Sequence, residues 1–420
     1  MKQALLAMFF TGLITASILA ADWPLFRGPD RDGKTSDTSA PLTWSADKNI
    51  KWKITLPSKG NSSPIVSAGK VFLSIAEDAK GTKRSLYCYD RNDGKTLWVK
   101  TVSYDKAEPT HAANPYCGST PAADGQRIVV WHGSAGVFCY DYNGKQLWSH
   151  DLGTFHHIWG YAASPIFVGD SIILNCGPGN RSFVTALDKT TGRTLWETPE
   201  PGGADDRSPQ SKNWLGSWAT PQVVNIANKS QILVAQPGHV NAYDPTDGHI
   251  LWTCAGTGDL AYMDVMLGNG VSSGTAVAMA GYGGKAMGFK LGGSGDVTAT
   301  HRLWQSTDKP PQRISNGIVV GPHLFTANEP HFACYEMATG KELWRFRPPS
   351  QVFWAAITAT PERLYVTSQN GPSYVFAPDA KEFKLLATND LGEGTNASIA
   401  ISNGQIFLRT FTHLYCIAGQ

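Results

Sequence analysis

Aromatic, amide and imidazole side chains gather repeatedly just before a short Ser/Thr-Pro motif. His111 and Asn114, for example, precede Thr120-Pro121. Flat apolar faces beside hydrogen-bonding groups suit a sugar, a planar ligand or an extended peptide. The residues that we select as candidate ligand-binding groups on this basis are His111, Asn114, His156, His157, Trp159, Tyr161, Trp214, Trp218, Arg313, Trp354 and Asn396.

The same residues allow a purely structural interpretation, and they carry no recognisable catalytic set. Neighbouring side chains of an extended segment point to opposite faces, so His156 and His157 make a poor chelate and we predict no metal. Arg313 either grips a carboxylate or sulfate or faces solvent. Asp205 and Asp206 lie in a Gly/Pro-rich loop, which indicates a solvent-exposed insertion and not a catalytic acid/base pair. Catalytic residues therefore stay unassigned, and the sequence leaves open whether the chain is an enzyme.

The elements that must position these groups recur with a period of about 40 to 50 residues, as in propellers. A copy has a short apolar strand, an Asp-containing turn with Gly, and then Trp, as in Asp188, Gly192 and Trp196, although the seventh copy, around 374–385, has lost its Trp. The Asp bonds turn amides, the Gly takes a left-handed conformation, and the indole covers the seam with the next blade. The tryptophans at this position are Trp98, Trp148, Trp196, Trp252, Trp304 and Trp344.

A second motif marks where each blade begins, because proline is tolerated at the first residue of a strand. We predict an all-β, eight-bladed β-propeller of four-stranded antiparallel blades. A strand at 50–54 would pair with the C-terminal strand at 414–417 and close the ring, which removes exposed sheet edges. The loops before the inner strands then converge on the axis. The eight motifs are Ser63-Pro64, Thr120-Pro121, Ser164-Pro165, Thr220-Pro221, Ser273-Gly274, Ser315-Asn316, Thr360-Pro361 and Ser398-Ile399.

Composition and the N-terminus bound the class of protein. The 420 residues carry a net charge of only +2 without a basic run, so we expect no nucleic-acid partner. Residues 1–21 combine Lys2, an apolar stretch and small residues before Asp22, which indicates a signal peptide. Residues 22–420 would form a single domain that is periplasmic or secreted, monomeric and not inserted in a membrane.

The seven cysteines fall into two groups. Four occupy one repeat position that is elsewhere Ala or Gly, so we expect them to be buried free thiols. The sequence leaves open whether any two of Cys117, Cys176 and Cys254 form a disulfide. The four at the repeat position are Cys88, Cys139, Cys334 and Cys416.

The run from Asp188 to Trp196 resembles the tryptophan-docking repeat of quinoprotein dehydrogenases. Further features are similar to those of a group of exported propellers with such pyrroloquinoline-quinone (PQQ)-type repeats that is abundant in planctomycete-like bacteria. These features are the segments 23–28, 110–121, 386–392 and 409–415. A more distant resemblance is to the periplasmic propeller lipoprotein that assists outer-membrane barrel assembly.

These resemblances imply two functions from different classes. The first is an exported scaffold that binds a protein or glycan ligand. The second is a PQQ-dependent type of oxidoreductase acting on alcohols or sugars, with its cofactor over the central funnel. The quinoprotein enzymes use adjacent cysteines and a calcium site, and neither signature is present in this sequence. We therefore assign no cofactor, keep PQQ as the alternative, and prefer the scaffold. The lipidation cysteine of the assembly lipoprotein is also missing before Asp22.

Overall fold

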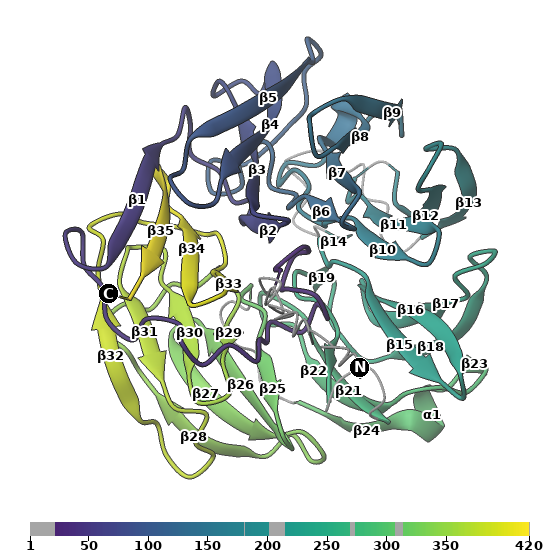
Figure 1. The fold of residues 1–420 in the computed structure, drawn as a ribbon. Helices are drawn as coiled ribbons and strands as arrows, with labels where there is room; N and C mark the ends of the chain where they lie inside the picture. The colour runs from purple at the N-terminus through teal and green to yellow at the C-terminus, as the bar shows by residue number, and fades with distance from the viewer. Residues whose placement is uncertain (1–21, 180, 201–214, 269–273, 307–313, 420) are drawn as a thin grey trace, which may run out of the picture.

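Eight β-sheets stand side by side around a central axis in the computed structural model, which describes residues 22–179, 181–200, 215–268, 274–306 and 314–419 (Figure 1). Each sheet contains a four-stranded antiparallel meander, and in blades 1 to 7 its strands follow one another in chain order from the axis to the rim. The eight-bladed propeller prediction is therefore confirmed. No helix of the described residues is long and apolar enough to cross a membrane. The predicted signal peptide lies outside the described residues.

The blades follow one another along the chain. Blades 1 and 2 comprise β2 (Ile65–Ser67), β3 (Lys70–Ala76), β4 (Lys83–Asp90), β5 (Thr96–Ser103), β6 (Ala122–Ala123), β7 (Arg127–Trp131), β8 (Val137–Asp141) and β9 (Gln146–His150), with a 3-10 turn at Gly133–Ala135. Blades 3 and 4 comprise β10 (Ile166–Val168), β11 (Ser171–Cys176), β12 (Phe183–Asp188), β13 (Thr194–Pro199), β15 (Gln222–Ile226), β16 (Lys229–Gln236), β17 (His239–Tyr243) and β18 (Ile250–Ala255). Blades 5 and 6 comprise β20 (Met266–Leu267), β21 (Thr275–Met279), β22 (Ala286–Lys290), β24 (Arg302–Gln305), β25 (Ile318–Val320), β26 (His323–Asn328), β27 (His331–Glu336) and β28 (Glu342–Phe346).

The last two blades and a few short elements complete the ring. Blades 7 and 8 comprise β29 (Thr358–Ala359), β30 (Leu364–Thr367), β31 (Ser373–Phe376), β32 (Leu385–Asn389), β33 (Ala400–Ser402), β34 (Gln405–Arg409), β35 (His413–Ala418) and β1 (Ile50–Thr55). Outside the meanders are β14 (Gly216–Ser217), which pairs in parallel with β19 (Leu260–Ala261), and β23 (Gly295–Asp296) and α1 (Thr298–His301) beside blade 4.

The two ends of the chain share blade 8. β1 pairs antiparallel with β35, with Trp52 opposite Cys416 and Lys53 opposite Tyr415. The rim strand of this blade therefore comes from the N-terminal side and its inner three strands from the C-terminal side. The predicted closure of the ring is confirmed.

The rim seams are held by docked indoles. Trp148 of blade 2 donates its Nε1–H to the carbonyl oxygen of Lys189 in blade 3 at 3.0 Å. Its ring covers Gly192, whose φ is +73° and where a Cβ would come within 2.5 Å of the indole. Only glycine meets both conditions. The other bonds of this kind run from Trp52 to Arg91, Trp98 to Tyr142, Trp196 to Pro245, Trp304 to Met337, and Trp344 to Asp379.

Two seams depart from this pattern. Blade 7 carries no tryptophan at this position, where Ala387 lies opposite Val375. Trp252 of blade 4 donates instead to Oε1 of Gln231 in its own blade, at 2.8 Å. The connection between β22 and β24 carries β23 and α1 where the other blades have a short turn, and β23 pairs directly with β18. Trp252 is fully buried under this insertion.

The small-residue position of the repeat is explained by cross-strand pairing with the same tryptophans. Cys139 lies opposite Trp148 and Ala186 opposite Trp196. At Gly288 a Cβ would come within 2.2 Å of Trp304. A large side chain has no room beside an indole that must lean over the seam. All seven cysteines are buried and free, so Cys117, Cys176 and Cys254 form no disulfide in this structure.

Two of the predicted blade starts are wrong. Blade 7 begins with β29, and Thr360-Pro361 follows that strand instead of preceding it. Blade 5 begins with β20 before residue 268, so Ser273-Gly274 is not its start, and Ser273 itself lies outside the described residues. In both cases a Ser-Gly or Thr-Pro pair elsewhere in the blade resembles the motif. The residue two positions before the first strand is Asp264 in blade 5 and Ala356 in blade 7.

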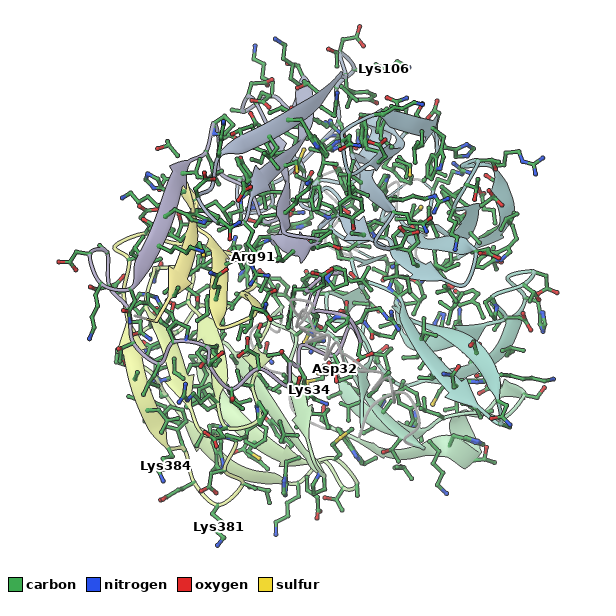
Figure 2. The ribbon with its side chains drawn as sticks, viewed as in Figure 1. Asp32, Lys34, Arg91, Lys106, Lys381 and Lys384 are labelled. Atoms are coloured by element: carbon green, nitrogen blue, oxygen red, sulfur yellow. The ribbon has the colours of Figure 1, made fainter. Side chains whose placement is uncertain are left out.

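Residues 22–45, which we call the N-terminal strap, cross one face of the ring (Figure 1). Trp23 pairs with Val66 of blade 1, and Lys34 pairs with Ala359 of blade 7. Asp32 and Lys34 lie near the centre of this face and form an ion pair of 3.0 Å (Figure 2). The strap thus ties distant blades together across the axis.

Candidate functional site

A cavity of about 130 Å³ lies on the axis. One water requires roughly 10–15 Å³, so the space suits a small ligand. Its walls are two tiers to which every blade contributes one residue at the same two positions. The lower tier is Ser63, Thr120, Ser164, Thr220, Asp264, Asn316, Ala356 and Ser398. The upper tier, two residues earlier in each blade, is Asn61, Gly118, Ala162, Trp218, Tyr262, Ile314, Trp354 and Asn396. Phe26, Asn114, Trp159 and Tyr282 complete the lining.

The lower tier is a nearly continuous ring of hydrogen bonds between blades. The backbone N–H of Ser63 donates to Thr120 Oγ1 at 2.9 Å, and the N–H of Thr120 donates to Ser164 Oγ at 3.1 Å. A side-chain oxygen of each blade thus accepts from the backbone of the blade before it. Only the step from Asn316 to Ala356 lacks this bond, because alanine has no acceptor. The remaining links run from Ser164 to Thr220, Thr220 to Asp264, Asp264 to Asn316, Ala356 to Ser398, and Ser398 to Ser63.

The upper tier divides into an aromatic wall and an amide wall. Blades 4, 5 and 7 contribute Trp218, Tyr262 and Trp354 to the aromatic wall. The Trp218 and Tyr262 rings lie 5.0 Å apart, and Tyr262 in turn contacts Tyr282 edge-on at 6.2 Å. Such faces bind flat apolar surfaces or the C–H faces of a saturated ring.

The amide wall consists of Asn61, Asn114 and Asn396, which hold one another in place. Asn61 and Asn396 both donate through Nδ2 to the carbonyl oxygen of Ala113, at 2.9 and 3.1 Å. Asn61 also donates to Asn114 Oδ1 at 3.1 Å, and Asn114 donates to the carbonyl oxygen of Trp159 at 2.7 Å. The Oδ1 atom of Asn61 is buried without a partner in the described structure.

The floor contains one carboxylate. Asp264 is 1 % exposed, and its Oδ1 accepts the N–H of Thr220 at 2.7 Å. Nη1 of Arg27, from the strap, lies 3.9 Å from Asp264 Oδ2. Burial raises the pKa of Asp264 to about 6, although Arg27 and the hydrogen bonds oppose this shift. The strap therefore supplies both Phe26 in the lining and the counter-charge beneath it.

The structure brings five of the eleven predicted residues into the lining: Asn114, Trp159, Trp218, Trp354 and Asn396. The others lie around it or away from it. His111 is exposed and its ring contacts that of Trp159 at a tilt of 35°, with ring centres 3.9 Å apart, and His157 is buried beside Trp218. Tyr161 is buried against Trp131.

Of the remaining three predicted residues, the structure describes only His156. His156 is exposed and does not line the cavity. Trp214 and Arg313 lie outside the described residues. The guanidinium that approaches the described floor is that of Arg27, which lies in the strap instead of an axial loop.

Sequence reasoning missed Asn61, Tyr262, Tyr282 and the strap residues Phe26 and Arg27. The signal for the first two is positional, because each stands two residues before the lower-tier position of its blade. Tyr282 lies after β21, and nothing in the repeat points to the axis there.

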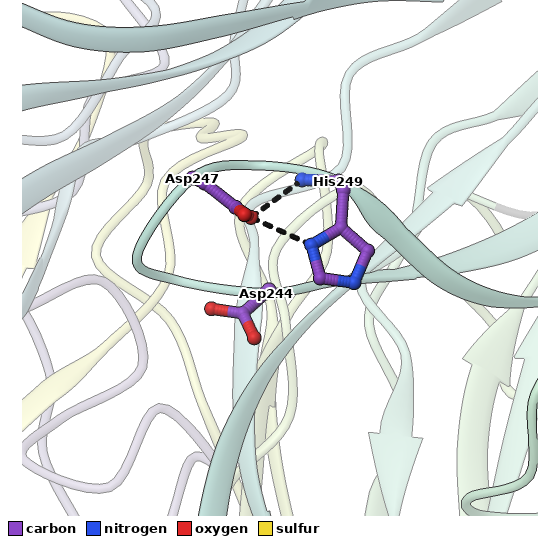
Figure 3. Close-up of side chains that lie close together, drawn as sticks. All are labelled: Asp244, Asp247 and His249. Carbon is purple, nitrogen blue, oxygen red and sulfur yellow. Dashed lines mark hydrogen bonds and ion pairs between the residues drawn. The ribbon is translucent and has the colours of Figure 1, made fainter.

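One rim turn groups possible metal ligands. Asp244, Asp247 and His249 gather in the turn between β17 and β18 (Figure 3). Asp247 Oδ1 accepts the backbone N–H of His249 at 3.1 Å and lies 2.7 Å from its Nδ1, while Asp244 accepts the N–H of Thr246. These are the Asp-to-amide bonds of the repeat's turn, so the cluster needs no ion to explain it.

Comparison with known families identifies the repeat. A family model described as outer membrane protein assembly factor BamB matches residues 37–113, 82–254 and 293–386. The chain belongs to this family. The structure of BamB from Moraxella catarrhalis superimposes with a TM-score of 0.60 at 14% identity, covering 88% of this chain and 96% of that one. A europium-containing methanol dehydrogenase gives a TM-score of 0.56 at 10% identity, covering 95% of this chain and 98% of that one. These likenesses show the fold.

Two curated proteins are similar in sequence. Quinohemoprotein alcohol dehydrogenase ADH-IIG of Pseudomonas putida is 25% identical over an alignment of 212 residues that covers 44% of this chain and 28% of that protein. Tetrathionate hydrolase of Acidithiobacillus ferrooxidans is 22% identical over an alignment of 319 residues that covers 73% of this chain and 50% of that protein. The matches thus span half or less of the length of these relatives.

The described lining does not fit PQQ. This quinone carries three carboxylates and needs cationic partners. No lysine or arginine is among the described lining residues, and Asp264 would repel a carboxylate. Arg27 lies on the strap side and is already engaged by Asp264 and by the carbonyl oxygen of Gly317 at 2.7 Å.

Proposed function

We propose that this protein is an exported binding scaffold that holds a small polar ligand, or the end of a larger one, in the axial cavity. The observation that carries the proposal is the cavity itself: two tiers drawn from all eight blades, with an aromatic wall facing an amide wall. Closure of the propeller alone does not require large aromatic side chains at the axis, so Trp218, Tyr262 and Trp354 on one side of it favour a binding role.

The scaffold assignment also agrees with the family, whose description names an assembly factor. A protein partner bound on the ring and a glycan bound in the cavity are compatible uses of one molecule. The predicted signal peptide favours export to the periplasm or the outside of the cell. N-terminal sequencing of the mature protein tests this point, and Asp22 is the expected first residue.

Trp354→Ala tests the cavity. Binding of free sugars, linear tripeptides and planar aromatic acids would be screened by saturation-transfer NMR on the wild-type protein. We expect at least one class to bind and Trp354→Ala to weaken that binding at least about tenfold, since an aromatic anchor is worth a few kcal/mol. Leu147→Ala, at an exposed rim position, is the control. Screening that finds no ligand sensitive to Trp354 overturns the proposal.

One observation favours a second function, oxidation of an alcohol or sugar. Asp264, with its pKa raised to about 6, is placed to accept a proton in the cavity. The poor fit to PQQ counts against it. Dye reduction by the purified protein, with added PQQ, calcium and a panel of alcohols and sugars, decides between the two functions. Turnover that is lost in Asp264→Asn would replace the scaffold proposal.

A further inference from the structure

The hydrogen bonds between blades leave the lower tier with unused hydroxyl donors. In five adjoining blades the tier residue is a serine or threonine, and each hydroxyl oxygen accepts a backbone N–H from the preceding blade. A hydroxyl that accepts still has a proton to donate. The described structure offers no acceptor for these protons. The five residues are Ser398, Ser63, Thr120, Ser164 and Thr220.

These five donors are all buried, between 2 % and 6 % exposed, and all line the cavity. A buried donor left without an acceptor destabilises the protein, because its hydration is lost and not replaced. A single unsatisfied donor is common in folded proteins, but five on one side of the cavity indicate a binding site for a ligand that carries hydrogen-bond acceptors.

The opposite arc of the floor accepts. Asp264 Oδ1 accepts the backbone N–H of Thr220, while the contacts of Oδ2 with Gln222 and Arg27 are long, at 3.4 and 3.9 Å. Arg27 offsets its charge, so the floor as a whole is nearly neutral while it stays locally polar. Donors on one arc therefore face an acceptor on the other.

We infer that the axial cavity binds a neutral polyhydroxylated ring, such as one sugar unit, with its hydroxyl edge on the lower tier and a ring face against the aromatic wall. This inference rests on the proposed function, since it names the ligand class of the same cavity. A ligand hydroxyl both accepts and donates, so neighbouring hydroxyls satisfy the Ser/Thr arc and Asp264 together. The C–H face of the ring lies against Trp218, Tyr262 or Trp354.

Other ligand classes fit the floor less well. An oxyanion would face the carboxylate of Asp264, whose counter-ion is already committed. An apolar planar ligand would cover five donors without giving them acceptors. An ammonium ion offers donors only, so it would leave the five hydroxyl protons without acceptors.

Calorimetric titration of the wild-type protein tests the ligand class. The probes are glucose, galactose, mannose and myo-inositol, with glucuronate, tetrahydropyran and an indole carboxylate for comparison. We expect a neutral polyol to bind and tetrahydropyran, which has the ring without its hydroxyls, not to bind. Deoxy analogues of the bound sugar should lose about tenfold or more at the positions that reach the floor. A methyl glycoside separates a free reducing sugar from the end unit of a glycan.

Matched variants locate the binding on the tier. Thr220→Val removes one of the five donors, together with the acceptor of the Ser164 N–H, with little change of shape, and should weaken sugar binding about fivefold or more. Thr358→Val is the control, because Thr358 is equally buried but donates to the carbonyl oxygen of Ile399 outside the cavity. Should Thr220→Val not fold, Asp264→Asn supplies the second measurement. It should weaken neutral sugars and raise the ratio of glucuronate to glucose affinity at least tenfold.

The outcomes separate the two proposals. Binding of indole carboxylate or glucuronate in preference to neutral polyols, sensitive to Trp354→Ala, overturns the ligand class and leaves the binding function standing. The absence of any ligand sensitive to Trp354→Ala overturns both. Equal loss of sugar binding in Thr220→Val and Thr358→Val also overturns the inference.

Discussion

The rim and the axis of this propeller use the same repeat in opposite ways. At the rim, six seams repeat one residue and one bond, an indole N–H to a carbonyl oxygen of the next blade. At the axis the backbone donors repeat almost as regularly, but the side chains differ from blade to blade, from Gly118 to Trp218 in the upper tier. The identical indole bonds at the rim hold neighbouring blades together and close the ring. The different side chains at equivalent axial positions can form a binding site, because a ligand needs different groups around it.

The sharpest way to test this comparison is to remove an indole from each region. Trp148→Ala deletes a docked rim side chain and its bond to Lys189, and should lower the free energy of unfolding by about 3–5 kcal/mol. Trp354→Ala, at the half-buried aromatic wall, should cost much less stability but weaken ligand binding at least about tenfold. Chemical denaturation and calorimetric titration of both variants measure the two effects. A Trp354→Ala protein as unstable as Trp148→Ala would mean that the axial aromatics are packing groups.

The axial loop before blade 2 depends on a buried ion pair. Arg84 Nη2 lies 2.5 Å from Glu108 Oε2, and both side chains are at most 3 % exposed. The Arg84 guanidinium also lies 4.9 and 4.8 Å from the ring centres of Tyr104 and Tyr116. This cluster anchors the segment that carries Asn114 into the amide wall.

Glu108→Ala should therefore cost about 3–4 kcal/mol, because it leaves the buried Arg84 charge without its partner. Glu342→Ala is the matched control, since its ion pair with Arg345 is solvent-exposed and worth less than about 0.5 kcal/mol. Both are measured by urea unfolding. A similar small loss in the two variants would show that the loop is held by packing alone.

The rim was predictable from sequence and the axis only in part, for a physical reason. Docking of the indole requires the same residue types in blade after blade, so residues such as Asp188, Gly192 and Trp196 identify a blade from sequence alone. The axial residues occupy equivalent positions in the blades but differ in residue type. Asp264 and Ala356 therefore stand where the Ser/Thr motif was expected, and Tyr262 carries no local mark. Phe26 and Arg27 reach the floor through the strap, a long-range contact for which the repeat holds no information.

Two carboxylates, one at the axis and one in the closing blade, should give opposite pH dependences. Burial raises the pKa of Asp264 from 3.8 to about 6, so between these values the folded protein holds a proton that the unfolded chain has lost. Stability from this group therefore falls as the pH rises from about 4 to 6, by on the order of 2–3 kcal/mol. Glu393 accepts bonds from Thr410, Thr412 and Tyr415, and its pKa is lowered to about 2. Its contribution is complete above about pH 4.5 and is lost as the pH falls toward 2.

Unfolding free energies measured from pH 2.5 to 7 for Asp264→Asn and Glu393→Gln separate these contributions. Relative to wild type, Asp264→Asn should improve as the pH rises from 4 to 6, because only the wild-type protein must keep a buried carboxyl group protonated over this range. Glu393→Gln should be destabilised at neutral pH and converge on wild type in acid. If the Asp264→Asn difference is flat across this range, the carboxylate is not isolated from water, and the cavity floor is more open than its burial indicates.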